Sequence, residues 1–243
     1  MSILGRAVRR ISPALHSSLV AIKRGEFELV PPRRIYAETH LHRLIQSVFP
    51  FRDGMFIEAG ANDGVTRSNT CYLARHQGWR GVLVEPTPHR AAQCGAARPE
   101  SVTINAALVA EEASGGTVEI VDMDRMSMVA TQDNALSLSD HRQHFEQIAA
   151  RYGQSAQVTR YKVPARSLGS ILADLGNPKV DFFSLDVEGF ELQVLRGLDF
   201  AACAPRFILV EDWDRGGVAD ILTHNGYRLH TRIEKDSLYE KLP

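Results

Sequence analysis

The chain has 243 residues, of which 44% are hydrophobic and 23% charged, and its formal net charge is −1. These proportions are those of an ordinary globular chain, and they exclude a disordered protein and a nucleic-acid binder that works by overall charge. The apolar runs are only a few residues long, so we expect no membrane-spanning segment. The length suits one large α/β domain or two small ones.

The three cysteines, Cys71, Cys94 and Cys203, form neither an even set nor a Cys-x-x-Cys pair. This argues against a disulfide framework and a structural zinc cluster, and it favours a reducing compartment. No signal peptide is evident, because basic residues stand where its apolar stretch would begin. We therefore expect a cytoplasmic protein.

The first 34 residues carry seven basic and two acidic side chains, a net charge of +5. Apolar residues recur at the helical interval from Leu4 to Ile22, and Ser12-Pro13 is a helix-start signal, so we expect two short amphipathic helices. We assign a basic helical extension to 1–50 and the main domain to 51–243. The basic arm either touches an anionic surface, such as the inner face of a membrane, or packs on the main domain.

From residue 51 onward, short β-rich runs alternate with helical stretches. Most of the runs are continuously apolar, which is typical of strands buried on both faces of a parallel sheet. The alternation predicts a doubly wound α/β sandwich. The expected strands are Met55–Glu58, Gly81–Glu85, Val102–Ala106, Val180–Asp186, Arg206–Glu211 and Tyr227–Thr231, and the expected helices are Ser68–Gln77, Glu191–Gly197 and Val218–Asn225.

The stretch from about 111 to 160 interrupts this alternation. It holds Gly115-Gly116, a polar segment at Met123–Met128 and a charged stretch around Ser139–Arg151 that we predict to be helical. We interpret it as an insertion after the third strand, near the site, where Ser127 would be placed to touch a substrate.

A glycine-containing loop, Glu58-Ala-Gly-Ala-Asn-Asp-Gly64, directly follows the first expected strand. Gly60 and Gly64 allow tight turns and the close approach of a ligand. A dinucleotide-binding loop would instead carry glycine at the position of Asn62, with the last glycine one residue beyond Gly64. The spacing fits better the type of loop that holds S-adenosylmethionine.

A second acidic signal stands at the end of the second expected strand. Glu85 lies 25 residues after Gly60, where a carboxylate can accept hydrogen bonds from both hydroxyls of an adenosine ribose. This position serves NAD and S-adenosylmethionine equally. Glu58 would favour the cationic end of the second ligand by charge, unless both glutamates are strand-end carboxylates in salt bridges.

Several separated blocks stand in one order along the chain. They are Phe56–Gly64, Ser68–Thr70, Gly78–Pro86, and Phe183–Glu191 with Leu195 and Gly197, within roughly residues 54–212. Together they resemble the FkbM-type methyltransferase family. The resemblance implies a class I Rossmann-like fold and methyl transfer from S-adenosylmethionine to a hydroxyl of a sugar or a polyketide-type molecule. The cofactor-binding residues expected from the loop and these blocks are Glu58, Gly60, Asn62, Asp63, Gly64, Asn69 and Glu85.

Acidic residues also end the fourth and fifth expected strands, at Asp186 and at Glu211-Asp212. In an open parallel sheet these ends line the ligand crevice. Three neighbouring carboxylates repel one another unless a cation lies between them, and their oxygens suit Mg²⁺ or another divalent cation. The set is similar to the metal site of catechol-type O-methyltransferases. The competing interpretation is an ordinary ion-pair cluster completed by Arg215.

Enzymes of that type usually carry a basic residue three positions after the first aspartate, where this chain has Gly189. We therefore assign the catalytic role to Asp186 and Glu188, with either one as general base, while Glu191 complements the dipole of the following helix. His89 is the best placed histidine for a base. We predict an O-methyltransferase that acts on a sugar or small-molecule hydroxyl and not on nucleic acid; the alternatives are a catalytically silent S-adenosylmethionine-binding scaffold and an NAD-linked oxidoreductase.

Overall fold

The computed structural model describes residues 36–122, 127–129, 158–212 and 217–243. The basic arm at 1–34, the helix expected around Ser139–Arg151 and Arg215 lie outside these residues. Within the described ranges, no helix is both long and apolar enough to cross a bilayer.

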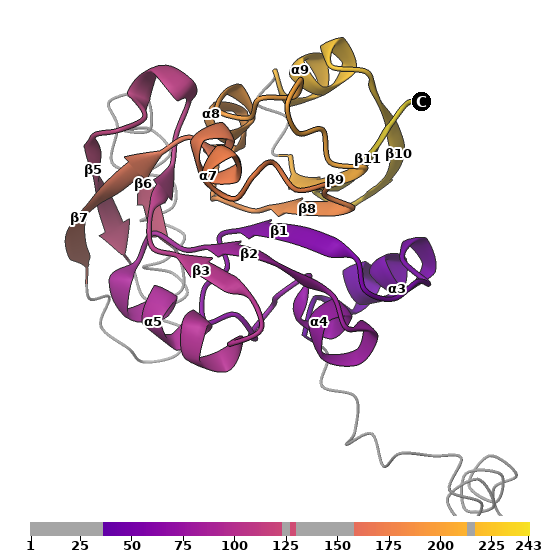
Figure 1. The fold of residues 1–243 in the computed structure, drawn as a ribbon, viewed down its shortest axis with the longest axis horizontal. Coiled ribbons are helices and arrows are strands. Elements are labelled where there is room, and N and C mark those ends of the chain that lie inside the picture. The colour runs from indigo at the N-terminus through magenta and orange to yellow at the C-terminus, as the bar shows by residue number, and fades with distance from the viewer. Residues whose placement is uncertain (1–35, 123–126, 130–157, 213–216) are drawn as a thin grey trace, which may run out of the picture. The chain divides into compact units, whose positions relative to one another are not determined.

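A seven-stranded sheet forms the centre of the fold, in the order β10-β11-β9-β8-β1-β2-β3 (Figure 1). The strands from β3 to β9 in this order run parallel, and β11 is antiparallel to both of its neighbours. The chain order along the sheet reverses between β1 and β8, which opens a crevice at their carboxyl ends. The strands are β1 (Met55–Ala59), β2 (Arg80–Val84), β3 (Val102–Ile104), β8 (Phe182–Leu185), β9 (Phe207–Glu211), β10 (Tyr227–Ile233) and β11 (Asp236–Lys241).

All six strands expected from the sequence are present, and the third and fourth are shorter than expected. After Ile104 the chain leaves the sheet, because the Asn105 side chain donates Nδ2–H bonds to the carbonyls of Glu85 and Pro86, at 2.9 and 2.8 Å. The chain then enters a second sheet as β4 (Ala107–Leu108).

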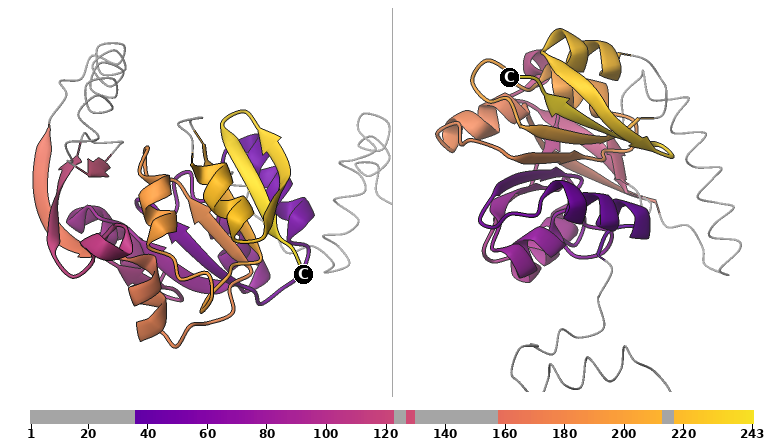
Figure 2. Two further views of the ribbon diagram at one scale, coloured as in Figure 1. Left: turned by 90° about the horizontal axis from the view of Figure 1, so that it is seen from above. Right: turned by 90° about the vertical axis from the view of Figure 1, so that its right-hand side faces the viewer.

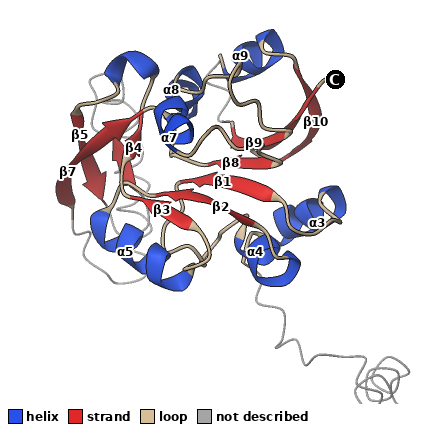
Figure 3. Ribbon diagram, viewed as in Figure 1, coloured by secondary structure: helices blue, strands red, loops and turns tan. Residues whose placement is uncertain are grey.

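Helices cover both faces of the central sheet, α7, α8 and α9 on one side and α3, α4 and α5 on the other (Figures 1 and 3). The three expected helices are confirmed as α4, α8 and α9. Helix α4 begins later than expected: its N-cap is Thr70, and Ser68 lies before the helix, where its Oγ accepts the N–H of Cys71 at 3.0 Å. The helices are α3 (Thr39–Val48), α4 (Cys71–Gln77), α5 (Pro88–Ala97), α7 (Leu168–Asp174), α8 (Glu191–Arg196) and α9 (Val218–His224).

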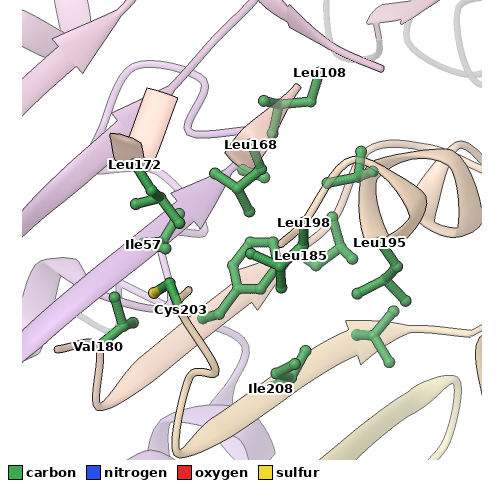
Figure 4. Close-up of a cluster of buried hydrophobic side chains, with 14 of the residues drawn as sticks. Ile57, Leu108, Leu168, Leu172, Val180, Leu185, Leu195, Leu198, Cys203 and Ile208 are labelled. Atoms are coloured by element: carbon green, nitrogen blue, oxygen red, sulfur yellow. The ribbon is translucent and has the colours of Figure 1, made fainter. Parts of the chain in front are cut away.

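The central strands β1, β2, β8 and β9 contribute alternate side chains to two hydrophobic cores. Phe183 and Ile208 face the core under α7, α8 and α9, which Figure 4 shows in part, whereas Phe182 and Phe207 face the core under α3 and α4. Because successive residues of a strand point to opposite faces, a continuously apolar strand fills both cores at once. The doubly wound architecture predicted from the apolar runs is confirmed.

Helix α3 belongs to the second of these cores, although its residues fall within the predicted extension. Leu41 and Ile45 are buried against the sheet, and the compact unit that carries both cores begins at Tyr36 rather than at residue 51. The apolar stripe of this helix therefore extends the domain towards the N-terminus.

The predicted insertion contributes to a four-stranded sheet with the order β4-β7-β5-β6. Strand β5 (Thr117–Asp122) pairs antiparallel with β6 (Ser127–Val129) and with β7 (Thr159–Arg166), which in turn pairs parallel with β4. This sheet lies beyond β3, on the opposite side of the molecule from the β10–β11 hairpin (Figures 1 and 2). The described part of the insertion is thus a wall of strands.

The end of α3 is held by an aromatic cluster, which gives a test of the fold. Phe49 is 1% exposed, and its ring centroid lies 5.4 Å from that of Trp79, 4.7 Å from that of Phe182 and 5.4 Å from that of Phe207. We expect Phe49→Ala to lower the free energy of unfolding by about 3–5 kcal/mol, measured by urea denaturation followed by circular dichroism. Leu229→Ala, at a half-exposed position, should change it by less than about 0.5 kcal/mol. Equal effects of the two substitutions would contradict the docking of α3.

Candidate functional site

A cavity lies at the carboxyl ends of β1, β2 and β8, with a volume of ≈ 930 Å³ including its open mouth. Gly60, Asn62 and Glu85 line one part of it, and Asp186 and Glu188 line another. The structure therefore brings the predicted cofactor loop and the predicted acidic pair into one cavity.

Gly60 is required by the neighbouring strand. It has φ +80°, and a Cβ atom at this position would lie 1.9 Å from the carbonyl oxygen of Asp186. Any side chain would therefore force the cofactor loop away from the end of β8. Gly64 also has a positive φ, +77°, and a Cβ there would meet Cys94 Sγ at 2.9 Å. Both glycines thus allow the loop to pack closely against neighbouring parts of the chain.

Glu85 holds the same loop from the side of β2. Its carboxylate is 2% exposed and accepts the N–H of Asn62 on Oε2 at 2.8 Å and the N–H of Thr87 on Oε1 at 2.9 Å. Burial raises the pKa of Glu85, and these hydrogen bonds oppose the rise. Each oxygen keeps a second lone pair, and Glu85 lines the cavity, so the carboxylate can still accept ribose hydroxyls there.

Glu58 is engaged by the chain itself. Its buried carboxylate accepts the hydroxyl of Ser68 at 2.8 Å, the hydroxyl of Thr70 at 2.6 Å and the backbone N–H of Asn69 at 2.9 Å. Burial raises its pKa, and the nearby guanidinium of Arg98 lowers it. Glu58 therefore fixes the turn that leads into α4, and the three donors occupy the carboxylate that we expected to face the cationic end of the cofactor.

Arg98 joins the end of the cofactor loop to the turn that leads into α4, a role that no sequence pattern predicted. The side chain is fully buried, and its Nη1 donates to the carbonyl oxygen of Gly64 at 3.1 Å while Nη2 donates to Thr70 Oγ1 at 3.4 Å. Its guanidinium carbon lies 5.2 Å from the centroid of the Phe56 ring. An arginine that follows an alanine-rich helix looks like a surface residue, so only the three-dimensional structure identifies it as a brace of the loop.

Asp63 and Asn69 also organise the loop. The Asp63 carboxylate accepts the N–H of Val65 at 2.9 Å and both the N–H and the hydroxyl of Thr66 at 2.7 Å. Burial alone would raise the pKa of Asp63, but these hydrogen bonds together lower it. The Asn69 amide donates to Ser184 Oγ at 3.0 Å, which ties the loop to β8. Among the described residues, the cavity wall includes neither of the two.

The acidic cluster differs in one member from the predicted metal set. The nearest carboxylate oxygens of Asp186, Glu188 and Glu211 lie within 4.8 Å of one another, and in the described part of the chain Asp212 does not belong to this group. Glu211 is the last residue of β9, and successive side chains of an extended chain point to opposite sides. Glu188 therefore takes the place that we had given to Asp212.

Glu188 is held in an unusual backbone conformation. Its φ is +56°, and Glu191 stabilises this loop by accepting the N–H groups of Val187 and Gly189 on Oε1, at 3.1 and 3.0 Å. The predicted role of Glu191 at the start of α8 thus extends to the loop before the helix, and burial raises its pKa to about 7. Burial and the neighbouring Asp186 raise the pKa of Glu188 to about 8.

Asp186 is exposed to the cavity, but the surrounding protein excludes much of the water from its carboxylate. This desolvation raises the pKa of Asp186, while the cations Lys235 and Arg67 lower it. Arg67 lines the cavity as well. The acidic pair therefore lies within the field of two basic side chains from distant parts of the chain.

Lys235 forms the ion pair of the cluster, although no pattern in the sequence predicts it. Its ammonium group contacts Glu211 Oε1, whereas the predicted partner Arg215 lies outside the described residues. The buried carboxylate of Glu211 therefore already has a cation, so the donor set does not fit the divalent ion that we expected at Asp186, Glu211 and Asp212.

The second sheet supplies the remaining wall of the cavity. Ile120, Val129 and Ser127 line it, and Phe190 lines it from the loop before α8 and packs on the same sheet. A buried ion pair between Arg90 and Asp122, at 3.1 Å, ties this sheet to α5. The insertion therefore does reach the site, as predicted, and it brings mostly apolar side chains.

The fold and the loop define a class I Rossmann-like, S-adenosylmethionine-dependent methyltransferase: a seven-stranded sheet with one reversed strand, a Gly60–Gly64 loop after β1 and an acidic residue after β2. The family model described as "Methyltransferase FkbM domain" matches residues 58–229, and the chain belongs to that family. No curated protein matches the chain.

Solved structures give only distant likenesses. A TehB-like SAM-dependent methyltransferase from Corynebacterium glutamicum is 13% identical over 95% of this chain and 100% of its own, with a TM-score of 0.44. A SAM-dependent methyltransferase from Aquifex aeolicus is 10% identical over 87% and 94%, with a TM-score of 0.43. Methyltransferase FkbM from Methylobacillus flagellatus is 14% identical over 77% of this chain and 43% of its own, also with a TM-score of 0.43.

The role of Glu85 can be tested by cofactor binding. Glu85→Gln replaces one acceptor oxygen by a donor that faces the N–H group of Asn62 or Thr87, so we expect S-adenosylmethionine to bind more weakly by roughly 1–3 kcal/mol. Isothermal titration calorimetry measures the change, with Glu112→Gln on the exposed surface as the control. Tight NAD binding without S-adenosylmethionine binding would overturn the assignment.

Proposed function

We propose that this chain transfers a methyl group from S-adenosylmethionine to a hydroxyl oxygen, most readily that of a sugar in a glycolipid, a polysaccharide or a nodulation-type signal. One observation carries the proposal: a single cavity is lined by Gly60, Asn62 and Glu85 and also by Asp186 and Glu188. The first group would hold the cofactor, and the second would face the acceptor.

The chemistry requires a group that accepts a proton. S-adenosylmethionine supplies an electrophilic methyl group; the new C–O bond forms as the C–S bond breaks, its electron pair stays on sulfur, and the hydroxyl proton leaves. A sugar hydroxyl is protonated at neutral pH, so a carboxylate that accepts the proton as the bond forms lowers the barrier. Glu188, beside Asp186, has a pKa near the working pH, which suits that task. Holding the acceptor oxygen in line contributes further.

The walls of the cavity are consistent with a sugar acceptor that carries an apolar group. Carboxylates accept hydrogen bonds from hydroxyls, and Arg67 donates them. Ile120, Val129 and Phe190 offer an apolar surface on the side of the second sheet. This surface also favours a second candidate, a polyketide-type small molecule. A silent scaffold would have no need of the acidic pair.

The basic arm at 1–34 favours a membrane surface as the location of the reaction. Its net charge of +5 and its helical apolar pattern would hold the enzyme at the anionic inner face of a membrane. Sugars linked to lipids are assembled on such surfaces, which agrees with the acceptor class proposed.

The acceptor can be identified by comparing cells with and without the gene. We expect one sugar of a lipid- or polysaccharide-derived glycan to lose the mass of one methylene unit when the gene is removed, because its O-methyl group is replaced by a hydroxyl. Mass spectrometry of released glycans measures this difference. If no glycan changes and a small-molecule hydroxyl does, the polyketide-type alternative holds.

The pH dependence then tests Glu188. Its carboxylate accepts a proton only when ionised, so with a pKa of about 8 we expect kcat/KM to rise with pH until it levels above that value. Glu188→Gln should lower kcat/KM by roughly 10²–10⁴-fold and remove this limb of the profile. Glu111→Gln, an exposed glutamate, serves as the control. An unchanged limb in Glu188→Gln would assign the proton to another group, with Asp186 first.

A further inference from the structure

We propose that Lys235 is the resident cation of the acidic cluster: its ammonium group takes the place of the divalent ion expected there and positions the carboxylates of Asp186, Glu188 and Glu211. The inference rests on the proposed function and adds a positioning residue to it. It makes the site independent of a divalent metal.

The strand topology brings Lys235 to the cluster. Strand β11 runs antiparallel to β9 with Asp236 opposite Glu211, and the pair Ile233–Asp236 closes a two-residue turn that contains Lys235. Because β11 is reversed, its first residue lies at the edge where the parallel strands end. The N–H of Asp212 donates to the carbonyl oxygen of Lys235 at 2.8 Å, which fixes the turn against the end of β9.

The charges of the cluster require a cation at this point. Glu211 is 3% exposed, and a carboxylate so deeply buried is strongly destabilising unless it is paired. Lys235 contacts Glu211 directly and also opposes the raised pKa values of Asp186 and Glu188. Its side chain is 46% exposed, so the ammonium group reaches the cluster from the solvent side.

An ammonium group and a divalent ion differ in how many carboxylate oxygens of the cluster they occupy. The ammonium group carries one charge and donates hydrogen bonds, whereas Mg²⁺ or Mn²⁺ needs several oxygens in its own coordination shell. With Lys235 on Glu211, a divalent ion would have to displace the lysine before it could use that oxygen. Asp186 and Glu188 then remain at the cavity to face the acceptor hydroxyl and its proton.

Removing the lysine should therefore create a metal site. In the full-length protein in low-salt buffer, we expect Lys235→Met to bind Mn²⁺ tighter than the unchanged chain by about tenfold or more, because a positive charge next to the ion is lost. Electron paramagnetic resonance of free Mn²⁺ measures the affinity. Lys235→Arg, which keeps the charge, should bind as weakly as the unchanged chain, and so should the exposed control Lys179→Met.

The location of the gained ion is tested by a second substitution. Adding Glu188→Gln to Lys235→Met should abolish the gain, and Lys235→Gln provides the same comparison if the methionine variant does not fold. Equal Mn²⁺ affinity in the unchanged chain and in folded Lys235→Met or Lys235→Gln, whether tight or weak, would overturn the proposal. Titration of S-adenosylmethionine into the same samples is a separate readout: its failure would count against the proposed function, and the Mn²⁺ result against Lys235.

Discussion

At the end of β1, Gly60 lies so close to the carbonyl oxygen of Asp186 that no side chain fits between them. This contact fixes the cofactor loop relative to the end of β8, and it joins the two halves of the site. Hydrogen bonds from the loop to Glu58 and Glu85, together with the buried guanidinium of Arg98, keep the loop in the shape that the contact requires. The chain's own contacts therefore hold the cavity wall on this side in place, and such preorganisation lowers the entropy cost of binding a cofactor.

The acidic side of the cavity depends on charge. Two carboxylates from the loop after β8 and one from the end of β9 lie within a few ångströms of one another, and burial makes their ionised forms costly. Lys235 offsets this cost for Glu211, and Glu191 supports the loop of Glu188 through two backbone N–H groups. Such an arrangement keeps one carboxylate near its pKa at neutral pH, which is the condition for a proton acceptor.

The second sheet adds a mostly apolar wall to the cavity. Its residues come from the part of the chain that interrupts the alternation of strands and helices, and the ion pair of Arg90 with Asp122 attaches it to α5. The apolar wall and the cofactor loop come from different segments of the chain, so a substitution in one need not alter the other. If related chains act on different acceptors, we expect the responsible residues to lie in this second sheet.

The sequence alone determined the parallel sheet, the glycine loop and the acidic end of β2, because these features depend on local patterns: continuous apolar strands, glycines at fixed spacing and a carboxylate at a strand end. Other features were decided by tertiary structure. The chain's reversal at β11 brings Lys235 to Glu211, and the turn after the loop takes up the carboxylate of Glu58. Local periodicity predicts which face of a strand a side chain occupies. The residue that the side chain contacts depends on which strands become neighbours and in which direction they run.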